Sequence, residues 1–219
     1  MLHPLVIDVS NLIKTYGGKT AVNGIDLQVH KGEVFALLGP NGAGKTTTVE
    51  ILEGYRGRDS GNVSVLGFDP NAKVSKSAER AWRDQIGIVL QTTMDALDLT
   101  VRETLTHFAK YYSNPKDSNA VIESVGLTEK VDEKVRTLSG GQRRRLDVAL
   151  GIIGRPELLF LDEPTTGFDP EARRAFWELI RNLRDEGTSI LLTTHYLDEA
   201  EALADRVAVI NNGQILEVA

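Results

Sequence analysis

The stretch that most constrains this chain is residues 39–47, Gly-Pro-Asn-Gly-Ala-Gly-Lys-Thr-Thr, which match the phosphate-binding pattern G-x-x-x-x-G-K-[ST]. The apolar run before it, residues 34–38, predicts a short buried strand, and residues 45–52 after it predict a helix. The loop is therefore expected between a strand end and a helix N-terminus, where unpaired N–H groups and the helix dipole attract anions. The alternative is a Gly-rich turn that contains Gly-Lys-Thr by chance, and the strand and helix around it argue against that.

Each residue type in this loop suits phosphate chemistry. Glycines at 39, 42 and 44 let the backbone curl around phosphate with no Cβ in the way. Lys45 is expected to reach the β- and γ-phosphates, and the Thr46 hydroxyl to ligate Mg²⁺. We predict nucleotide contacts for all nine residues: Gly39, Pro40, Asn41, Gly42, Ala43, Gly44, Lys45, Thr46 and Thr47. The loop alone does not distinguish an ATPase from a GTPase or a kinase.

Composition sets the class of protein. A chain of 219 residues with 41% hydrophobic and 26% charged residues is sufficient for one α/β domain with a full core. The net charge of −6 argues against bulk nucleic-acid binding, and the absence of cysteine excludes disulfides. No apolar run approaches the ~20 residues of a membrane helix, and the N-terminus lacks the basic region of a signal peptide. We expect a soluble, cytoplasmic chain that reaches a membrane only through another protein.

A second group of candidate functional residues, Asp162 and Glu163, follows the apolar run at residues 158–161. Ligand chemistry in α/β sheets lies at the C-terminal ends of buried strands. Asp162 is expected to hold Mg²⁺ through water, which complements Thr46, and Glu163 to polarise the attacking water as a general base. Without a phosphate loop, two acids at a strand exit would be unremarkable surface groups.

Residues 138–142, Leu-Ser-Gly-Gly-Gln, open another predicted helix. Ser139 can cap it, and the two glycines leave bare N–H groups that form a second anion site. The alternative is an ordinary Ser-capped helix with a loose start. Three arginines follow at 143–145, and we expect them to form a solvated or salt-bridged face.

The remaining pattern predicts the fold class. Alternating apolar residues at 5–9 and 21–29, joined by a Gly-Gly turn, predict an antiparallel hairpin. A turn at 59–62 precedes a strand at 63–66, further buried strands are expected at 86–90 and 189–193, and a strand pair at 206–210 and 214–218. Helices are expected from the capping box at Thr100, from 119 to 125, from the Asp169 cap and from 197 to 204.

The prediction is thus one domain over residues 1–219, an α/β P-loop NTPase core with a mainly parallel sheet. It carries an N-terminal antiparallel β subdomain and an inserted helical subdomain. The insertion itself covers 92–137, and with the next helix the subdomain covers about 92–150.

Phosphate loop, strand-end glutamine, Leu-Ser-Gly-Gly-Gln, Leu-Leu-Phe-Leu-Asp-Glu-Pro and strand-end histidine follow one another in this order. Together they resemble the nucleotide-binding domain of ATP-binding-cassette (ABC) transporters, and the resemblance covers essentially the whole chain. It implies an Mg-dependent ATPase that uses ATP and Mg²⁺. It also implies a transmembrane permease as partner, and a homodimer or paralogous heterodimer that sandwiches ATP at the inner face of the membrane.

The resemblance also implies roles for single residues. Tyr16 looks like the aromatic that stacks on adenine, with Val22 beside it, although by itself Tyr16 is more typical of a packed strand end. Gln91 looks like the residue that contacts Mg²⁺ and water, and His195 like the switch histidine on the γ-phosphate. Lys45, Gln91, Glu163 and His195 form the implied catalytic set, and Thr46, Gln91 and Asp162 the implied metal set.

Five further positions look like contacts to ATP held by the other subunit. They are the signature residues and the D-loop aspartate: Ser139, Gly140, Gly141, Gln142 and Asp169. An N-cap role accounts for Asp169 equally well. Phe168 stands where the family more often has Leu, which is expected to leave the chemistry unchanged.

The chain is most similar to bacterial drug and antibiotic exporter ATPases, through residues 52–56, 65–70 and 196–201. Those proteins usually continue beyond the strand pair with which this chain closes. The alternative is a soluble, non-transport ABC ATPase that acts on nucleic acid or ribosomes. A GTPase is disfavoured, because the nearest thing to its Asn-Lys-x-Asp motif, residues 114–117, has the wrong order and contains a proline. A binding module without catalysis is disfavoured by the presence of both Glu163 and His195.

Overall fold

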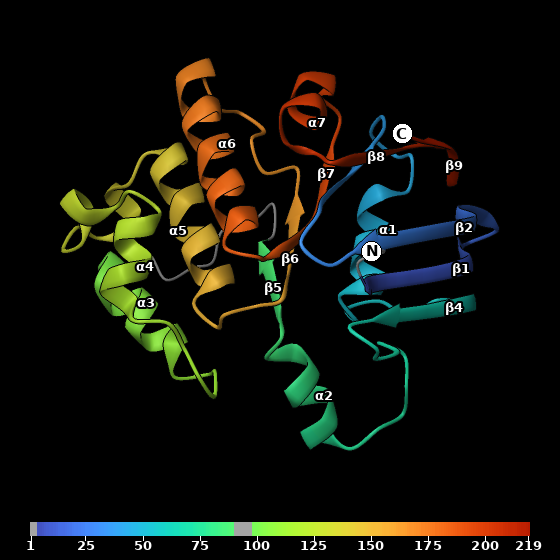
Figure 1. Ribbon diagram of the computed structural model, residues 1–219, viewed down its shortest axis with the longest axis horizontal. Helices are drawn as coiled ribbons and strands as arrows, with labels where there is room; N and C mark the ends of the chain where they lie inside the picture. Colours follow the sequence, from blue (N-terminus) through green and yellow to red (C-terminus); the bar gives the residue numbers. More distant parts are fainter. Residues whose placement is uncertain (1–3, 90–97) are drawn as a thin grey trace.

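The computed structural model describes residues 4–89 and 98–219, which form two β-sheets and seven α-helices (Figure 1). The first sheet has three antiparallel strands in the order β2-β1-β4, and the second has six strands in the order β5-β6-β7-β3-β8-β9. Within the second sheet β5, β6, β7, β3 and β8 run parallel, and only β9 is antiparallel to its neighbour. The predicted α/β class with a mainly parallel sheet is confirmed.

The three-stranded sheet contains the predicted N-terminal hairpin. β1 (Leu5–Tyr16) pairs antiparallel with β2 (Lys19–His30), and β1 also pairs with β4 (Ser60–Val65). The turn predicted at 59–62 is wrong, because residues 60–62 already belong to β4. Gly61 has φ +95°, and a Cβ there would clash with the Asn11 carbonyl. Gly61 thus allows β4 to approach β1 closely, beside an irregularity in the β1 register.

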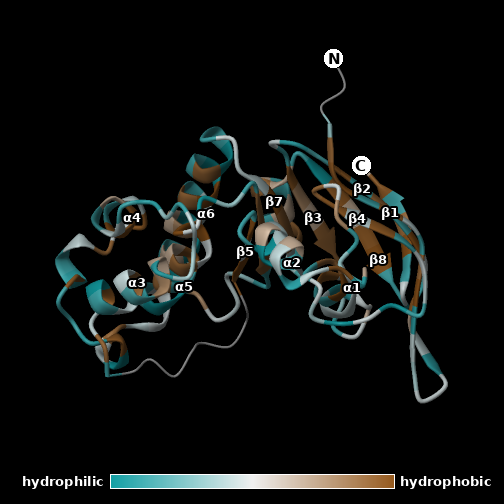
Figure 2. Ribbon diagram, turned by 90° about the horizontal axis from the view of Figure 1, so that it is seen from below, coloured by the Kyte–Doolittle hydropathy of each residue, from teal (hydrophilic) through white to brown (hydrophobic). Residues whose placement is uncertain are grey.

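The second sheet is the centre of the molecule, and its inner strands are largely apolar and buried (Figure 2). Its strands are β3 (Val34–Leu38), β5 (Ile86–Val89), β6 (Leu158–Asp162), β7 (Ser189–Thr194), β8 (Arg206–Asn211) and β9 (Gln214–Val218). Successive side chains of β3 enter different cores: Phe35 and Leu37 pack toward the three-stranded sheet, whereas Val34 and Ala36 pack toward the helices. Burial on both faces explains why β3 and β6 are apolar runs instead of alternating patterns.

The helices begin where their caps predict. The Thr100 capping box opens α3 (Val101–Ala109), Asp117 caps α4 (Ser118–Ser124), and Ser139 with Gln142 forms a capping box on α5 (Gly140–Ile152). Asp169 caps α6 (Pro170–Asp185), and α7 (Leu197–Leu203) and α1 (Lys45–Leu52) complete the predicted set. Sequence patterns missed α2 (Lys76–Arg83), whose signals are the Ser75 cap and the buried Trp82.

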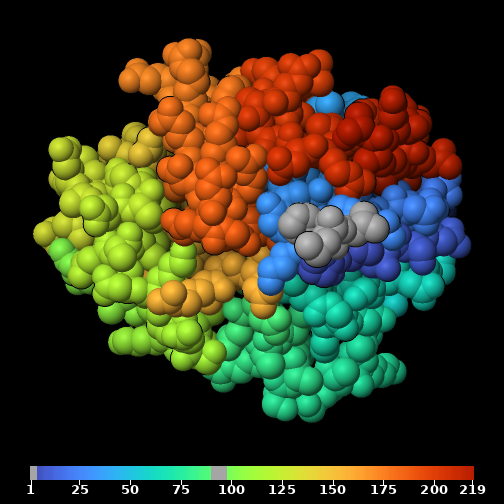
Figure 3. Space-filling model, in the orientation of Figure 1, coloured from blue at the N-terminus to red at the C-terminus, as the bar shows by residue number. Residues whose placement is uncertain are grey.

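The helical region lies to one side of the central sheet. Helices α3, α4 and α5 form one lobe, with short 3₁₀ turns at Thr128–Lys130 and Val135–Thr137, while the N-terminal strands occupy the opposite side (Figures 1 and 3). The part of the predicted insertion at 92–97 lies outside the described residues. In the described part of the chain, none of the helices combines the length and the apolar character that crossing a bilayer needs.

Candidate functional site

The phosphate loop joins the end of β3 to the start of α1, as its pattern predicts. Gly44, in the left-handed conformation, is the N-cap of α1, and no side chain caps the helix. The first N–H groups of α1 are therefore available to an anion. The Lys45 ammonium donates to the carbonyls of Gly39 (2.7 Å) and Pro40 (3.2 Å), which places its charge at the same loop.

The three glycines of the loop are needed for three different reasons. A Cβ on Gly39 would clash with the Ile210 carbonyl, so Gly39 serves the packing of the loop on β8 and not phosphate access. Gly44 combines φ +106° with a close approach to the Ala21 carbonyl, which would lie 2.5 Å from a Cβ at this position. Gly42 has φ +79° and open space around the position of a Cβ. The expectation that all three simply clear space for phosphate is corrected to this division.

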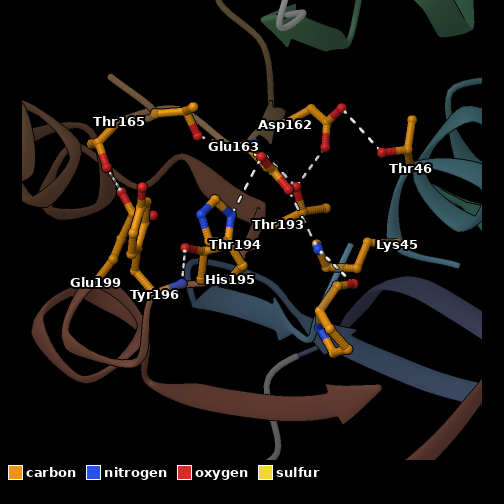
Figure 4. A network of polar contacts seen from close by, with 12 residues as sticks. Lys45, Thr46, Asp162, Glu163, Thr165, Thr193, Thr194, His195, Tyr196 and Glu199 are labelled. Carbon is orange, nitrogen blue, oxygen red and sulfur yellow. Dashed lines mark hydrogen bonds and ion pairs between the residues drawn. The ribbon is translucent and has the colours of Figure 1, made fainter. Parts of the chain in front are cut away.

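Asp162 and Glu163 stand at the C-terminal end of β6, and Thr193 of the neighbouring strand β7 orients both of them (Figure 4). The Thr193 hydroxyl donates to Asp162 Oδ1 (2.5 Å) and accepts from the Glu163 N–H (3.0 Å). Glu163 has φ +43°, a conformation that L-residues rarely adopt. Thr193 is fully buried and was not identified from the sequence, because no motif marks a threonine inside an apolar strand.

Lys45, Glu163 and His195 come together at this strand end. Glu163 Oε1 lies 3.4 Å from the Lys45 ammonium, and Glu163 Oε2 lies 3.4 Å from His195 Nδ1 (Figure 4). Thr46 Oγ1 lies 3.4 Å from Asp162 Oδ2. Segments far apart in the sequence thus bring a cation, a hydroxyl, two carboxylates and an imidazole together, and Lys45, Thr46 and Glu163 of this group line one cavity.

That cavity has a volume of about 570 Å³. Its lining combines the phosphate loop, the first hairpin, the β8–β9 turn and the residue after β6: Tyr16, Lys19, Thr20, Ala21, Asn41, Gly42, Gly44, Lys45, Thr46, Thr47, Glu163, Asn212 and Gly213. The size of the cavity and its anion-attracting wall suit a nucleoside triphosphate.

The Leu-Ser-Gly-Gly-Gln stretch lines a different cavity of about 660 Å³. Ser139, Gly140, Gly141 and Asp169 are among the residues that line it. Among the described residues that line it, none belongs to the loop at 39–47, although Glu163 lines both cavities. The Ser139–Gln142 capping box uses the Gln142 N–H, so the helix start is capped as well as glycine-rich.

A model of the ABC transporter family matches residues 22–166. The linearmycin resistance ATP-binding protein LnrL of Bacillus subtilis is 38% identical over 97% of this chain and 68% of its own length. The Nod factor export ATP-binding protein I of Ralstonia nicotianae is 44% identical over 95% of this chain and 65% of its own length. A solved structure of cbiO1 from Clostridium perfringens, part of the ABC transporter complex cbiONQ, superposes with a TM-score of 0.88. That structure is 28% identical, and the match covers 98% of this chain and 88% of that one.

The chain belongs to the ABC transporter family. Its fold is that of the P-loop ATP-binding cassettes of these transporters. It spans about two thirds of the length of the curated relatives it matches.

The cassette's residues fit magnesium and ATP. Thr46 and Asp162 offer hard oxygen ligands side by side, the type that Mg²⁺ prefers. Among the residues the structure describes there is no group of three or more His, Cys, Asp or Glu side chains that could hold a metal. Gln91, the third expected magnesium contact, lies outside the described residues.

Tyr16 and Val22, the two residues predicted to lie at the adenine base, occupy different places in the structure. Tyr16 lines the nucleotide cavity and is 38% exposed, with Lys14 and Arg56 each within 5.4 Å of its ring centroid. Val22 is fully buried in the core between the sheets and does not line the cavity. Thr20 and Ala21 line the cavity instead.

Of the solvated or salt-bridged face expected at 143–145, Arg144 is not solvated, but it does form a salt bridge, with its Nη1 4.0 Å from Asp147 Oδ2. Its guanidinium is buried and donates to the carbonyls of Asp162 (3.0 Å) and Pro164 (3.0 Å). Arg144 therefore anchors the chain that leaves β6, on which Glu163 stands. Burial lowers the pKa of the Arg144 guanidinium, while the nearby Asp147 opposes that shift.

Proposed function

We propose that this chain is the ATP-hydrolysing subunit of an exporter and couples ATP turnover to transport through a separate transmembrane protein. The observation that carries the catalytic part is the placement of Glu163, which lies between Lys45 and His195 and lines the nucleotide cavity. The relatives whose names describe resistance or export support the exporter part.

The proposed chemistry uses the residues in distinct roles. The phosphate loop and Lys45 bind the β- and γ-phosphates of ATP. Mg²⁺, held by Thr46 and through water by Asp162, would neutralise charge that develops on the phosphates. Glu163 accepts a proton from the attacking water, and His195 contacts the γ-phosphate. The Thr193 hydroxyl holds the Asp162 carboxylate and the Glu163 backbone in place.

The proposed assembly is a dimer in which each ATP lies between two subunits. The support is the separation of the signature residues and the phosphate loop into two cavities of one chain. A two-fold axis brings the signature cavity of one subunit to the phosphate loop of the other, and it forms two equivalent sites. Homodimer and paralogous heterodimer both satisfy this geometry. The dimer is placed at the inner face of the cell membrane by its permease.

The catalytic proposal is tested with Glu163→Gln. The amide keeps size and hydrogen bonding but removes basicity, so turnover is expected to fall about 10²–10⁴-fold, the usual range for general-base catalysis. ATP binding survives in this variant, whereas Lys45→Ala weakens binding itself. Glu178→Gln, an exposed acid on α6, is the matched control and keeps wild-type turnover.

Phosphate release and equilibrium ATP binding are the two measurements. Turnover within a few-fold of wild type in Glu163→Gln would remove the general-base role. The exporter part is tested by recovering the tagged chain from membranes: a co-purifying multi-span protein supports it, and ribosomes or DNA in its place contradict it.

A further inference from the structure

His195 does not stand alone at the end of β7. The ring of the next residue, Tyr196, lies against the imidazole with 4.0 Å between the ring centroids and 40° between the ring planes. Both side chains are partly buried, and Figure 4 shows them side by side beneath Glu163. An imidazole on a strand exit is otherwise free to rotate about its side-chain bonds. The neighbouring ring restricts that rotation.

Tyr196 is itself held from a third segment. The Arg173 guanidinium lies 4.7 Å from the centroid of the Tyr196 ring, a cation–π distance. Arg173 Nη1 also donates to Asp198 Oδ2 (3.2 Å), so the guanidinium is fixed from two directions. The Arg173 Nε is buried and has no hydrogen-bond partner. The guanidinium therefore contacts the Tyr196 ring while one of its N–H donors stays unsatisfied.

Arg173 lies one turn into α6, and its N–H bonds to the Asp169 carbonyl. Asp169 caps α6 and lines the signature cavity. A continuous set of contacts therefore runs from Asp169 through Arg173 and Tyr196 to His195, and from His195 to Glu163.

We infer that Arg173 and Tyr196 are positioning residues for His195. The cation–π contact holds the tyrosine ring, and the ring holds the imidazole in the orientation that places Nδ1 beside Glu163. This inference rests on the proposed function, because the orientation of His195 matters to turnover only if ATP is hydrolysed beside Glu163. In this inference the aromatic ring of Tyr196, and not its hydroxyl, positions His195.

The kinetic test compares four variants. Tyr196→Leu removes the ring and Arg173→Gln removes the cation, and each is expected to lower kcat about ten-fold, since small misplacements of a catalytic group are costly. KM for ATP stays within about two-fold, because the phosphate-loop contacts are kept. Tyr196→Phe keeps the ring and retains kcat. Arg174→Gln, an exposed arginine one residue further along α6, is the matched control and also retains kcat.

Two kinetic results would overturn the inference. One is turnover in Tyr196→Leu and Arg173→Gln equal to that of Arg174→Gln. The other is Tyr196→Phe being as slow as Tyr196→Leu, which would make the hydroxyl the working group. Thermal unfolding of each variant identifies any loss that arises from misfolding, and Tyr196→Phe keeps the test decisive if Tyr196→Leu does not fold.

A spectroscopic test is independent of hydrolysis. A ring 4.0 Å away shifts the His195 Cε1 proton from the position of a free histidine, and this resonance can be assigned because the chain has four histidines. In the nucleotide-free protein, Arg173→Gln is expected to move it toward the free position, and Arg174→Gln to leave it unchanged. An unmoved resonance in Arg173→Gln contradicts the inference. If Glu163→Gln hydrolyses ATP normally, the proposed function fails while this measurement still decides the positioning contact.

Discussion

Glu53 is a carboxyl group whose surroundings oppose its charge. It follows α1, its side chain is 6% exposed, and Asp162 and Glu50 lie near it. Burial, followed by the charges of Asp162 and Glu50, raises the pKa of Glu53 from its ordinary value of 4.5 to about 8. The folded protein therefore keeps a proton on Glu53 at neutral pH that the unfolded chain has lost.

This difference predicts how stability depends on pH. Between pH 4.5 and 8 the unfolded state binds fewer protons at Glu53 than the folded state, so its contribution to the free energy of unfolding falls as pH rises. Glu53→Gln removes this slope, and the variant should gain stability over wild type as the pH is raised from about 5 toward about 9. Urea unfolding of the nucleotide-free protein across this range measures the slope. If the free energy of unfolding changed with pH equally in wild type and Glu53→Gln, the raised pKa of Glu53 would be contradicted.

At the scale of elements, the contact between α5 and β6 depends on Arg144. Its guanidinium bonds two carbonyls at the end of β6, a forked geometry that an ammonium cannot reproduce. Arg144→Lys should lower the free energy of unfolding by about 1–3 kcal/mol, the cost of leaving buried acceptors unpaired. For a chain of this size that is a fall in Tm of roughly 2–12 °C.

Arg145→Lys is the matched control for Arg144→Lys. Arg145 is half-buried on the same helix and donates to the Val125 carbonyl (3.2 Å), a single bond that a lysine can replace. Calorimetry of both variants gives the comparison. Equal Tm values in the two would show that the buried fork of Arg144 does not hold the end of β6.

At the scale of the whole molecule, the shared-site dimer predicts complementation. Lys45→Ala damages the phosphate loop, and Gly141→Asp sets a carboxylate in the signature cavity. Each variant alone should be nearly inactive, because both of its sites carry a lesion. In a mixed dimer both lesions fall in one site and the other site is intact.

Random 1:1 mixing makes about half of the dimers mixed, and each mixed dimer has one intact site of its two. Up to roughly a quarter of all sites should therefore be intact, and the mixture should recover up to that share of wild-type ATPase activity. Strong coupling between the sites lowers that figure. ATP hydrolysis of the mixture measures it, with subunit exchange followed by two different tags. Exchange without any regain of activity would rule out sites shared between subunits.

Much of the fold could be predicted because its signals are local. The caps at Thr100, Ser139 and Asp169 start their helices through hydrogen bonds within three residues, so the sequence alone places those starts. Apolar runs such as the one in β6 predict buried strands because both faces of the sheet are covered. The phosphate loop and the two acids at the end of β6 are recognisable for the same reason: each motif is contiguous along the chain.

Only the tertiary structure decided which separate segments meet. Thr193 orients Asp162 and Glu163 from a neighbouring strand, and Arg144 reaches the end of β6 from α5, yet nothing in their own sequence surroundings marks either residue. The pairing of Ser60 and Asn62 with β1 turned an expected turn into a strand for the same reason. Hydrogen bonds to distant carbonyls and the packing of strands depend on contacts between residues far apart in the chain, and these contacts leave no periodic signal in the amino-acid sequence.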